Sequence, residues 1–375
     1  MTKKIIIIIC AVILVIALTA GGFIAVQKIS PQEIKNGPAV FDMGEDNYCI
    51  IFETSEKGSG YVKYTFGGEE KIIWDATAGA IATHDTVHKI IVPKNELRGN
   101  TYTVGSQYVS FKFAYTAIKG GSVESEPIAF DGEEKEDDIK ILAITDIHEM
   151  ETEVKQAVSH FDDNFDMVVM LGDITSNFEE KEKFTDHILA DAAFLSKGEI
   201  PVVYTRGNHE TRGEYASQLL QYFPTATGEF YYTFDFGGLS AIVLDSGEDK
   251  EDSHEEYSGL VDFSTYREQE YKWIQSLNKE DFDGKYKIVF CHFPKINDHF
   301  GVNWMTPLKE LGFQLVVGGH HHRSELFDLD IPALDACGKY GDGWAASSLT
   351  LKDGKIRMLT INTEGETLLD ETISS

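Results

Sequence analysis

A regular alternation of short apolar runs and helical patterns from residue 139 onwards constrains the fold of this chain more than any other feature. The first run, Ile139–Thr145, is β-branched and apolar, which is typical of a buried strand in a parallel sheet. Strands that alternate with helices predict βαβ units, so we expect an α/β (α+β) domain whose mixed β-sheets are flanked by helices. The predicted strands are 139–145, 167–171, 201–205, 287–291 and 314–317, with a hairpin at 231–244 and antiparallel strands at 348–372; the predicted helices are 151–161, 179–195, 212–222 and 264–277.

Each of the five core strands is followed by side chains that can bind a metal ion. Because the carboxyl ends of parallel strands meet at one edge of a sheet, these side chains are expected to lie close together. Carboxylate, amide oxygen and neutral imidazole form a ligand set suited to manganese, iron or zinc. The blocks are, in chain order, Asp146-Ile147-His148, Gly172-Asp173, Gly207-Asn208-His209-Glu210, His292 and Gly319-His320-His321-His322.

In order and spacing, these blocks resemble the motifs of the calcineurin-like metallophosphoesterase superfamily over roughly residues 140–323. The resemblance implies a metallophosphoesterase fold for residues 139–375 and two divalent or trivalent metal ions, with manganese, iron and zinc as open choices. It also implies that Asp173 bridges the two ions. One ion would be held by Asp146, His148, Asp173 and His322, and the other by Asp173, Asn208, His292 and His320.

Two further residues are candidates for contact with the substrate. By the same resemblance, His209 would contact the phosphate and protonate the leaving oxygen. Arg206 either contacts the phosphate or pairs with a surface carboxylate. The expected function is hydrolysis of a phosphomonoester or phosphodiester by a metal-bridged hydroxide. The alternative is a cell-surface binding protein with a non-catalytic metal-binding domain.

Residues 38–130 have a different pattern, in which short strands are separated by turns and no helical period is sustained. They predict an all-β sandwich that resembles the fibronectin type III-like domain preceding the catalytic domain of purple acid phosphatases. An acidic linker, residues 131–138, separates the two domains. Those phosphatases carry a tyrosine where this chain has Ser176, and their first motif lacks the histidine that His148 supplies. A tyrosinate–iron centre is therefore not expected.

The N-terminus carries a membrane signal. Lys3 and Lys4 precede an apolar run from Ile5 to Val26, and roughly 20 residues suffice to cross a bilayer. Residues 1–29 are therefore expected to form an uncleaved transmembrane helix, with the lysines in the cytoplasm and the catalytic domain outside the cell membrane. A cleaved signal sequence, which would give a secreted protein, is the alternative.

Charge and cysteine content limit the partners. The chain has 33 Lys and Arg against 62 Asp and Glu, a net charge of −29, which disfavours duplex nucleic acid. Its four cysteines form no Cys-x-x-Cys pair, so neither a disulfide framework nor a thiolate zinc site is expected. The expected partners are a phosphate-ester substrate and the membrane, and protein partners stay open. An acidic segment, Gly247–Glu256, is either a solvated loop or a cover over the metal edge, with His254 and Tyr257 as candidate substrate contacts.

Overall fold

The structure is a computed structural model that describes residues 32–44, 46–162, 164–341 and 343–375. Its strands are β1 (Ile34–Asp42), β2 (Asn47–Phe66), β3 (Glu69–Trp74), β4 (Ala76–Thr77), β5 (Ala80–Ile81), β6 (Asp85–Pro93), β7 (Thr101–Phe113), β8 (Thr116–Glu124), β9 (Ile128–Ala129), β10 (Ile139–Ile144), β11 (Met167–Met170), β12 (Pro201–Tyr204), β13 (Tyr232–Phe236), β14 (Leu239–Val243), β15 (Tyr286–Phe290), β16 (Leu315–Gly318), β17 (Ser324–Phe327), β18 (Ala333–Ala336), β19 (Gly338–Tyr340), β20 (Gly343–Lys352), β21 (Lys355–Asn362) and β22 (Thr367–Ser374). Its helices are α2 (Lys94–Leu97), α3 (Glu151–Val158), α4 (Ala190–Ser196), α5 (Phe263–Ser276) and α6 (Met305–Leu311), with a π-helical turn η1 (Phe184–Leu189) and 3-10 turns η2 (Ala216–Tyr222), η3 (Glu255–Tyr257), η4 (Lys279–Asp281) and η5 (Ile296–Asp298).

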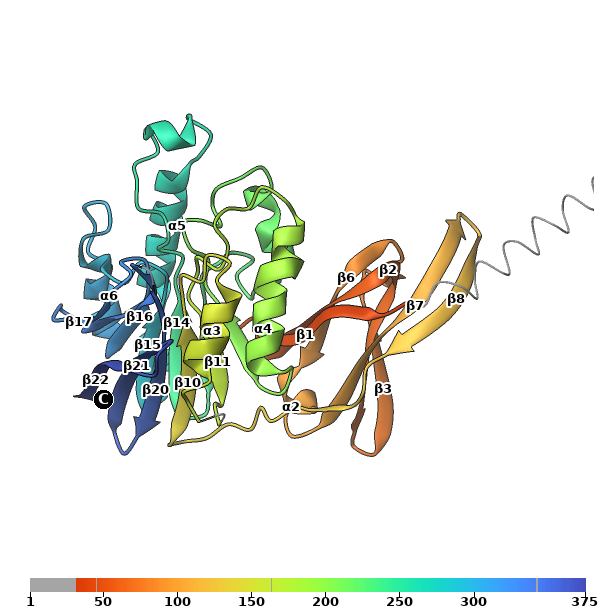
Figure 1. The fold of residues 1–375 in the computed structure, drawn as a ribbon, viewed down its shortest axis with the longest axis horizontal. Coiled ribbons are helices and arrows are strands. Elements are labelled where there is room, and N and C mark those ends of the chain that lie inside the picture. The colour runs from red at the N-terminus through yellow and green to blue at the C-terminus, as the bar shows by residue number, and fades with distance from the viewer. Residues whose placement is uncertain (1–31, 45, 163, 342) are drawn as a thin grey trace, which may run out of the picture.

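The C-terminal part of the chain consists of two sheets packed face to face between two layers of helices (Figure 1). The first sheet contains the order β22-β21-β20-β10-β11-β12, and the second has the order β13-β14-β15-β16-β18-β17. Ile139, Ile141 and Ala143 of β10 face the core between the sheets, while Leu142 and Ile144 face the core under α3 and α4. Because both faces of β10 are buried, its sequence is a continuous apolar run. The predicted mixed sheets flanked by helices are confirmed.

Residues 32–130 form a β-rich front module that continues the first sheet. Strand β1 pairs in parallel with β12 and antiparallel with β2, so the sheet runs on through β1, β2, β7 and β8. The first half of β2 pairs with β1 and β6, and the second half pairs with β3 and β7. Both halves contribute side chains to one core, which contains Ile50, Phe52, Val62 and Tyr64. The fibronectin type III-like assignment is not confirmed.

The segment predicted as an acidic linker, residues 131–138, is bound to the catalytic part. Asp137 accepts a hydrogen bond from Tyr286 Oη, and Asp138 pairs with Lys352 at 2.8 Å. Lys135 pairs with Asp166 at 2.5 Å. These contacts hold the start of β10 in place.

The predicted helices differ from the observed ones more than the strands do. The helix expected at 179–195 starts only at Phe184, with the π-helical turn η1, and continues as α4 to Ser196. The helix expected at 212–222 is reduced to η2, because Arg212 and Tyr215 form backbone hydrogen bonds with Phe178 instead of continuing a helix. In the described ranges no helix is long and apolar enough to cross a membrane. The predicted anchor, residues 1–29, lies outside these ranges.

Candidate metal centre

The residues that follow strands β10, β11, β12, β15 and β16 meet at one edge of the two sheets. Asp146 and Asp173 follow neighbouring strands of the first sheet, and His292 and His320 follow neighbouring strands of the second. Within the described residues, their side chains and those of His148, His209 and His322 form three overlapping groups whose ligand atoms lie within 4.8 Å of one another. The structure therefore brings together the residues that the sequence placed at strand ends.

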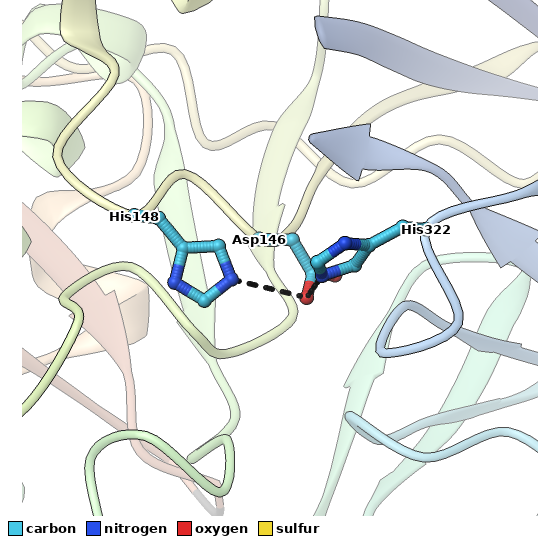
Figure 2. Close-up of side chains that lie close together, drawn as sticks. All are labelled: Asp146, His148 and His322. Atoms are coloured by element: carbon cyan, nitrogen blue, oxygen red, sulfur yellow. Dashed lines mark hydrogen bonds and ion pairs between the residues drawn. The ribbon is translucent and has the colours of Figure 1, made fainter. Parts of the chain in front are cut away.

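The first group consists of Asp146, His148 and His322 (Figure 2). Asp146 Oδ1 lies 3.0 Å from His322 Nε2 and 3.7 Å from His148 Nε2. The other carboxylate oxygen of Asp146 accepts hydrogen bonds from Thr145 Oγ1 at 2.7 Å and from the His320 backbone N–H at 2.9 Å. These bonds orient Asp146 and leave Oδ1 facing the two imidazoles.

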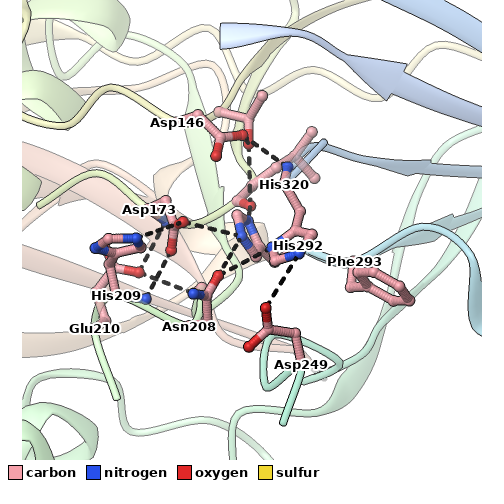
Figure 3. A network of polar contacts seen from close by, with 12 residues as sticks. Asp146, Asp173, Asn208, His209, Glu210, Asp249, His292, Phe293 and His320 are labelled. Carbon is pink, nitrogen blue, oxygen red and sulfur yellow. Dashed lines mark hydrogen bonds and ion pairs between the residues drawn. The ribbon is translucent and has the colours of Figure 1, made fainter. Parts of the chain in front are cut away.

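The second group contains Asp173, His292 and His320, and Asn208 joins it (Figure 3). Asp173 Oδ2 lies 3.2 Å from His292 Nε2 and 3.9 Å from the Nε2 atom of both His148 and His209. Asp173 Oδ1 accepts the His209 backbone N–H at 2.9 Å. One oxygen of Asp173 thus faces both groups, which is the position required of a bridging ligand.

The residues present fit a metal ion. His292 Nδ1 lies 2.8 Å from the Leu171 carbonyl, which can only accept, so this nitrogen carries a proton and Nε2 is directed to the centre. Asn208 Oδ1 lies 3.1 Å from His292 Nε2 and 3.1 Å from His320 Nδ1. With the Asn208 oxygen in this orientation and His292 Nε2 deprotonated, these atoms would direct lone pairs to one point, as a cation requires. The donor set of carboxylate, amide and imidazole suits manganese, iron or zinc.

Electrostatics keep the carboxylates charged despite their burial. Asp146 is fully buried and Asp173 is 2% exposed. Burial alone would raise the pKa of both carboxyls, but the neighbouring imidazoles outweigh burial and lower the pKa of each. Burial and the charge on His292 lower the pKa of His320 to about 4, so His320 is in the neutral form that binds metals.

The backbone of the ligand loops is strained. Five of the seven predicted ligands have φ between +47° and +72°, a region that side-chain-bearing residues rarely adopt and that costs about 1–3 kcal/mol per residue. Such strain persists only where the surroundings impose it, and it concentrates at functional sites. The five are Asp146, His148, Asp173, His320 and His322.

Glu210 holds part of the strained backbone of the ligand loops in place. It was not among the site residues predicted from the sequence. It is fully buried, and its carboxylate accepts the backbone N–H groups of Asp173 at 2.8 Å, Ile174 at 2.6 Å, Thr175 at 3.0 Å and Gly207 at 2.9 Å. A Cβ at Gly207 would lie 2.2 Å from Asp173 Oδ1, so only glycine fits there. The position of Glu210 at the end of the Gly207–Glu210 block was the available signal.

His209 lies at the rim of the centre. Its Nδ1 lies 2.7 Å from the Ser176 carbonyl and so donates to it, while Nε2 faces Asp173. Its ring meets that of His148 edge-on at 4.6 Å, and its side chain is 30% exposed. Burial is the main cause that lowers the pKa of His209. This placement leaves Nε2 available to a substrate.

Arg206 does not point into the metal centre. Its Nη2 lies 2.6 Å from Asp245 Oδ2, and its guanidinium carbon lies 4.6 Å from the centre of the Phe230 ring. Of the two roles left open for Arg206, the structure favours pairing with a carboxylate, and that carboxylate is buried rather than on the surface.

Arg212 occupies the rim position instead. Its Nη2 lies 2.9 Å from the side-chain amide atom of Asn208 that points away from His292 and His320. This contact is a hydrogen bond when that atom is the amide oxygen. The same atom lies 3.9 Å from Asp249 Oδ1 and 3.8 Å from Glu256 Oε2, and both carboxylates belong to the acidic segment. Asp249 Oδ2 in turn lies 3.6 Å from His320 Nε2. The only sequence signal for Arg212 was its basic side chain two residues after Glu210.

The acidic segment therefore reaches the metal edge through Asp249. Tyr257 is buried, and its ring packs edge-on against Phe263 at 5.7 Å. His254 Nδ1 accepts the Glu256 backbone N–H at 3.3 Å. Of these two predicted substrate contacts, His254 is therefore engaged within the segment and Tyr257 packs against the start of α5. His321 is turned to Asp335 at 3.2 Å, consistent with its expected position outside the ligand set.

Residues 139–324 match the family model of the calcineurin-like phosphoesterases. This part of the chain is a calcineurin-like phosphoesterase domain. With the metal-ligand groups above, the match makes the protein a metal-dependent phosphoric ester hydrolase, which disfavours the alternative of a non-catalytic binding protein.

One solved structure supports the fold. A purple acid phosphatase from yellow lupin (Lupinus luteus) seeds is similar at 12% sequence identity with a TM-score of 0.57, over 90% of this chain and 74% of that chain. PhoD is similar at 10% identity with a TM-score of 0.49, over 92% of this chain and 90% of that chain. No curated protein sequence matches this chain.

Proposed function

We propose that this protein is a dinuclear metallophosphoesterase that is anchored in the cell membrane by residues 1–29 and hydrolyses a phosphomonoester or phosphodiester at the outer face. The observation that carries the dinuclear assignment is the position of Asp173 Oδ2, which faces His292 at 3.2 Å and His148 at 3.9 Å. A single carboxylate oxygen between two imidazole groups is suited to join two ions.

The ligands of each ion follow from the two groups. Asp146, His148, Asp173 and His322 would hold one ion, and Asp173, Asn208, His292 and His320 would hold the other. Bound ions would supply Lewis-acid polarisation of a phosphoryl oxygen and activation of water.

His209 would donate a proton to the leaving oxygen. Its Nδ1 proton is fixed by the Ser176 carbonyl, so a transferable proton sits on Nε2 only in the imidazolium form. The negative charge of a bound phosphate next to Nε2 favours that form. Loss of the proton to the leaving oxygen then returns His209 to the neutral imidazole.

Arg212 would bind the phosphate at the rim. Its side chain is 28% exposed, its short contact is with the neutral amide of Asn208, and its ion pairs with Asp249 and Glu256 are long, at 3.8–3.9 Å. A guanidinium with weak partners can exchange them for the oxygens of a phosphate, which it binds in a bidentate manner. We assign phosphate binding to Arg212 rather than to Arg206, because the Arg206 guanidinium forms an ion pair with Asp245.

The test is metal content and hydrolysis measured on residues 30–375 reconstituted with manganese, iron or zinc. The substrates are p-nitrophenyl phosphate and its bis ester. Asp173→Asn should lower hydrolysis by at least about 100-fold, because even residues that only support metal ligands contribute about 10–100-fold. Asp186→Asn is the matched control, since that carboxylate is half exposed and, among the described residues, forms an ion pair only with Lys35, at 3.5 Å. Two bound ions without turnover of either ester would contradict the proposal.

A further inference from the structure

The hairpin formed by β7 and β8 extends beyond the body of the front module (Figure 1). Strand β7 pairs with β2 only as far as Tyr108. From Val109 to Lys119 the two strands of the hairpin pair only with each other among the described residues. We call residues 109–119 the hairpin tip. A two-stranded ribbon of this kind is marginally stable in water on its own.

Aromatic side chains are exposed on the hairpin tip. Phe111 is 48% exposed, Phe113 is 55% exposed and Tyr115 is 93% exposed. Phe111 lies opposite Ile118 and Phe113 lies opposite Thr116, so these side chains share one face of the ribbon. Phe113 and Tyr115 contact each other edge-on at 6.0 Å. Three neighbouring aromatic rings in water indicate a surface made for a partner.

The charge of this region is opposite to that of the rest of the chain. Residues 97–123 contain no Asp or Glu, although the whole chain contains 62 and has a net charge of −29. The hairpin tip carries Lys112 and Lys119, both exposed. Aromatic rings flanked by lysines fit an apolar layer beneath the phosphates of lipid headgroups.

The position of the hairpin relates it to the predicted anchor. Gln32 Nε2 donates hydrogen bonds to Ser106 Oγ at 3.0 Å and to the Glu56 carbonyl at 3.3 Å. Ser106 lies on β7, just before the hairpin tip, and Gln32 is three residues beyond the end of the predicted anchor. Three extended residues span about 10 Å, whereas the seven residues from Ser106 to Phe113 span about 23 Å. The tip is therefore long enough to reach a bilayer that residues 1–29 cross.

We propose that the hairpin tip inserts into the headgroup region of the bilayer that holds residues 1–29. The rings of Phe111, Phe113 and Tyr115 would lie at the boundary with the acyl chains, and Lys112 and Lys119 would contact lipid phosphates. The protein would then contact the membrane at two points, residues 1–29 and the hairpin tip. These two contacts would fix the orientation of the catalytic domain above the bilayer. This inference rests on the membrane anchoring included in the proposed function, but not on the chemistry of the metal centre.

The experiment uses the full chain in vesicles of phosphatidylcholine and phosphatidylglycerol at a ratio of 7:3. A spin label is attached at Ala114→Cys in the hairpin tip, or at Glu364→Cys in the distant turn between β21 and β22, with Cys10→Ser in both chains. Cys49, Cys291 and Cys337 are buried and do not compete for the label. Power saturation in the presence of oxygen or a water-soluble nickel complex reports the depth of each label.

The proposal predicts that the label at 114 lies within the bilayer interface and the label at 364 in water. Combined Phe111→Ser, Phe113→Ser and Tyr115→Ser changes should move the label at 114 into water. The control Leu260→Ser should not, since Leu260 is also an exposed apolar residue, at 87%, but lies far along the chain.

Two results would overturn the proposal. If the chain floats with the vesicles but the label at 114 is as accessible to nickel as that at 364, the anchor stands and the tip instead serves a protein or polysaccharide. If the chain does not float with the vesicles, the anchoring fails and the hairpin proposal fails with it. Hydrolysis of p-nitrophenyl phosphate by the same sample tests the phosphoesterase activity separately.

Discussion

At the scale of single residues, His292 is where metal binding and protonation compete. Burial alone would lower its pKa, but the charge of Asp173 and the contact with it, together with the charge of Asp146, raise the pKa to about 10. Without a metal, His292 is therefore protonated at neutral pH, and a metal ion must displace that proton to reach Nε2.

We expect metal binding to release at least one proton and the apparent affinity to rise about tenfold per pH unit between pH 6 and 9. Isothermal titration calorimetry with manganese or zinc, in buffers of different ionisation enthalpy, measures the number of protons. His292→Ala should bind more weakly and release one proton fewer. An affinity that does not change over this pH range would contradict the protonated state of His292.

The two arginines near the centre should respond differently to substitution. Arg206→Ala leaves Asp245, which is 5% exposed, without its ion pair, so we expect a loss of about 3–5 kcal/mol in the free energy of unfolding. Arg212→Ala removes a half-buried group whose ion pairs are long and whose short contact is with the neutral amide of Asn208, so the free energy of unfolding should change by less than about 1 kcal/mol. The KM of Arg212→Ala for p-nitrophenyl phosphate should rise about 10-fold or more, because a charge-assisted hydrogen bond to the phosphate is lost. Urea unfolding and steady-state kinetics measure both, with Arg212→Lys as the conservative comparison. If Arg206→Ala left the free energy of unfolding unchanged and raised KM, then Arg206, not Arg212, would be the residue that binds the phosphate.

At the scale of elements, α4 contains a buried acid that makes stability depend on pH. Asp191 is 3% exposed, and its Oδ2 has no hydrogen-bond partner in the described part of the chain. Burial, followed by the charge of Glu151, raises the pKa of Asp191 to about 8. Between pH 4 and 8 the unfolded chain ionises this carboxyl while the folded protein keeps it neutral. The Asp191 contribution to stability therefore falls as pH rises through this window and is constant below it.

We expect Asp191→Asn to raise the free energy of unfolding at pH 8 by about 1–3 kcal/mol more than at pH 5. Urea titrations of both proteins at the two pH values give this difference directly. Asp186→Asn, on η1 just before α4 and half exposed, is the control and should show no such difference. Equal effects of Asp191→Asn at both pH values would show that the carboxyl is already ionised in the folded protein.

The same scale shows what the sequence could predict. The five core strands were placed to within one residue because both of their faces are buried and their sequences are short β-branched runs. The candidate metal ligands could be predicted because they lie in the loops that follow those strands. Glu210 and Arg212 received no role, since their contacts come from loops whose positions depend on tertiary hydrogen bonds, such as those of Phe178 with Arg212 and Tyr215. In the front module the sequence predicts short strands separated by turns, whereas β2 is one strand of 20 residues with an irregular register between Glu53 and Gly58.

At the scale of the whole molecule, the pairing of β1 with β12 joins the front module to the catalytic part. Val40 pairs with Pro201 and Phe41 pairs with Val202, in parallel. Ala39, Phe41 and Ile51 of the front module belong to the same core as Val202 and Ile188 of the catalytic part. The edge of β12 and one side of this core therefore depend on residues that come before the acidic linker.

We expect the two parts to unfold together, so that residues 30–375 give one calorimetric transition whose van't Hoff and calorimetric enthalpies agree. A chain of residues 131–375 would expose β12 as an unpaired edge strand with apolar neighbours, and it should aggregate or melt well below the longer chain. Phe41→Ala tests the same contact without a deletion. It removes a fully buried ring from the shared core, so it should lower the free energy of unfolding by about 3–5 kcal/mol while keeping a single transition. Two separate transitions, with only the lower one shifted by Phe41→Ala, would instead mean that the catalytic part folds independently of β1.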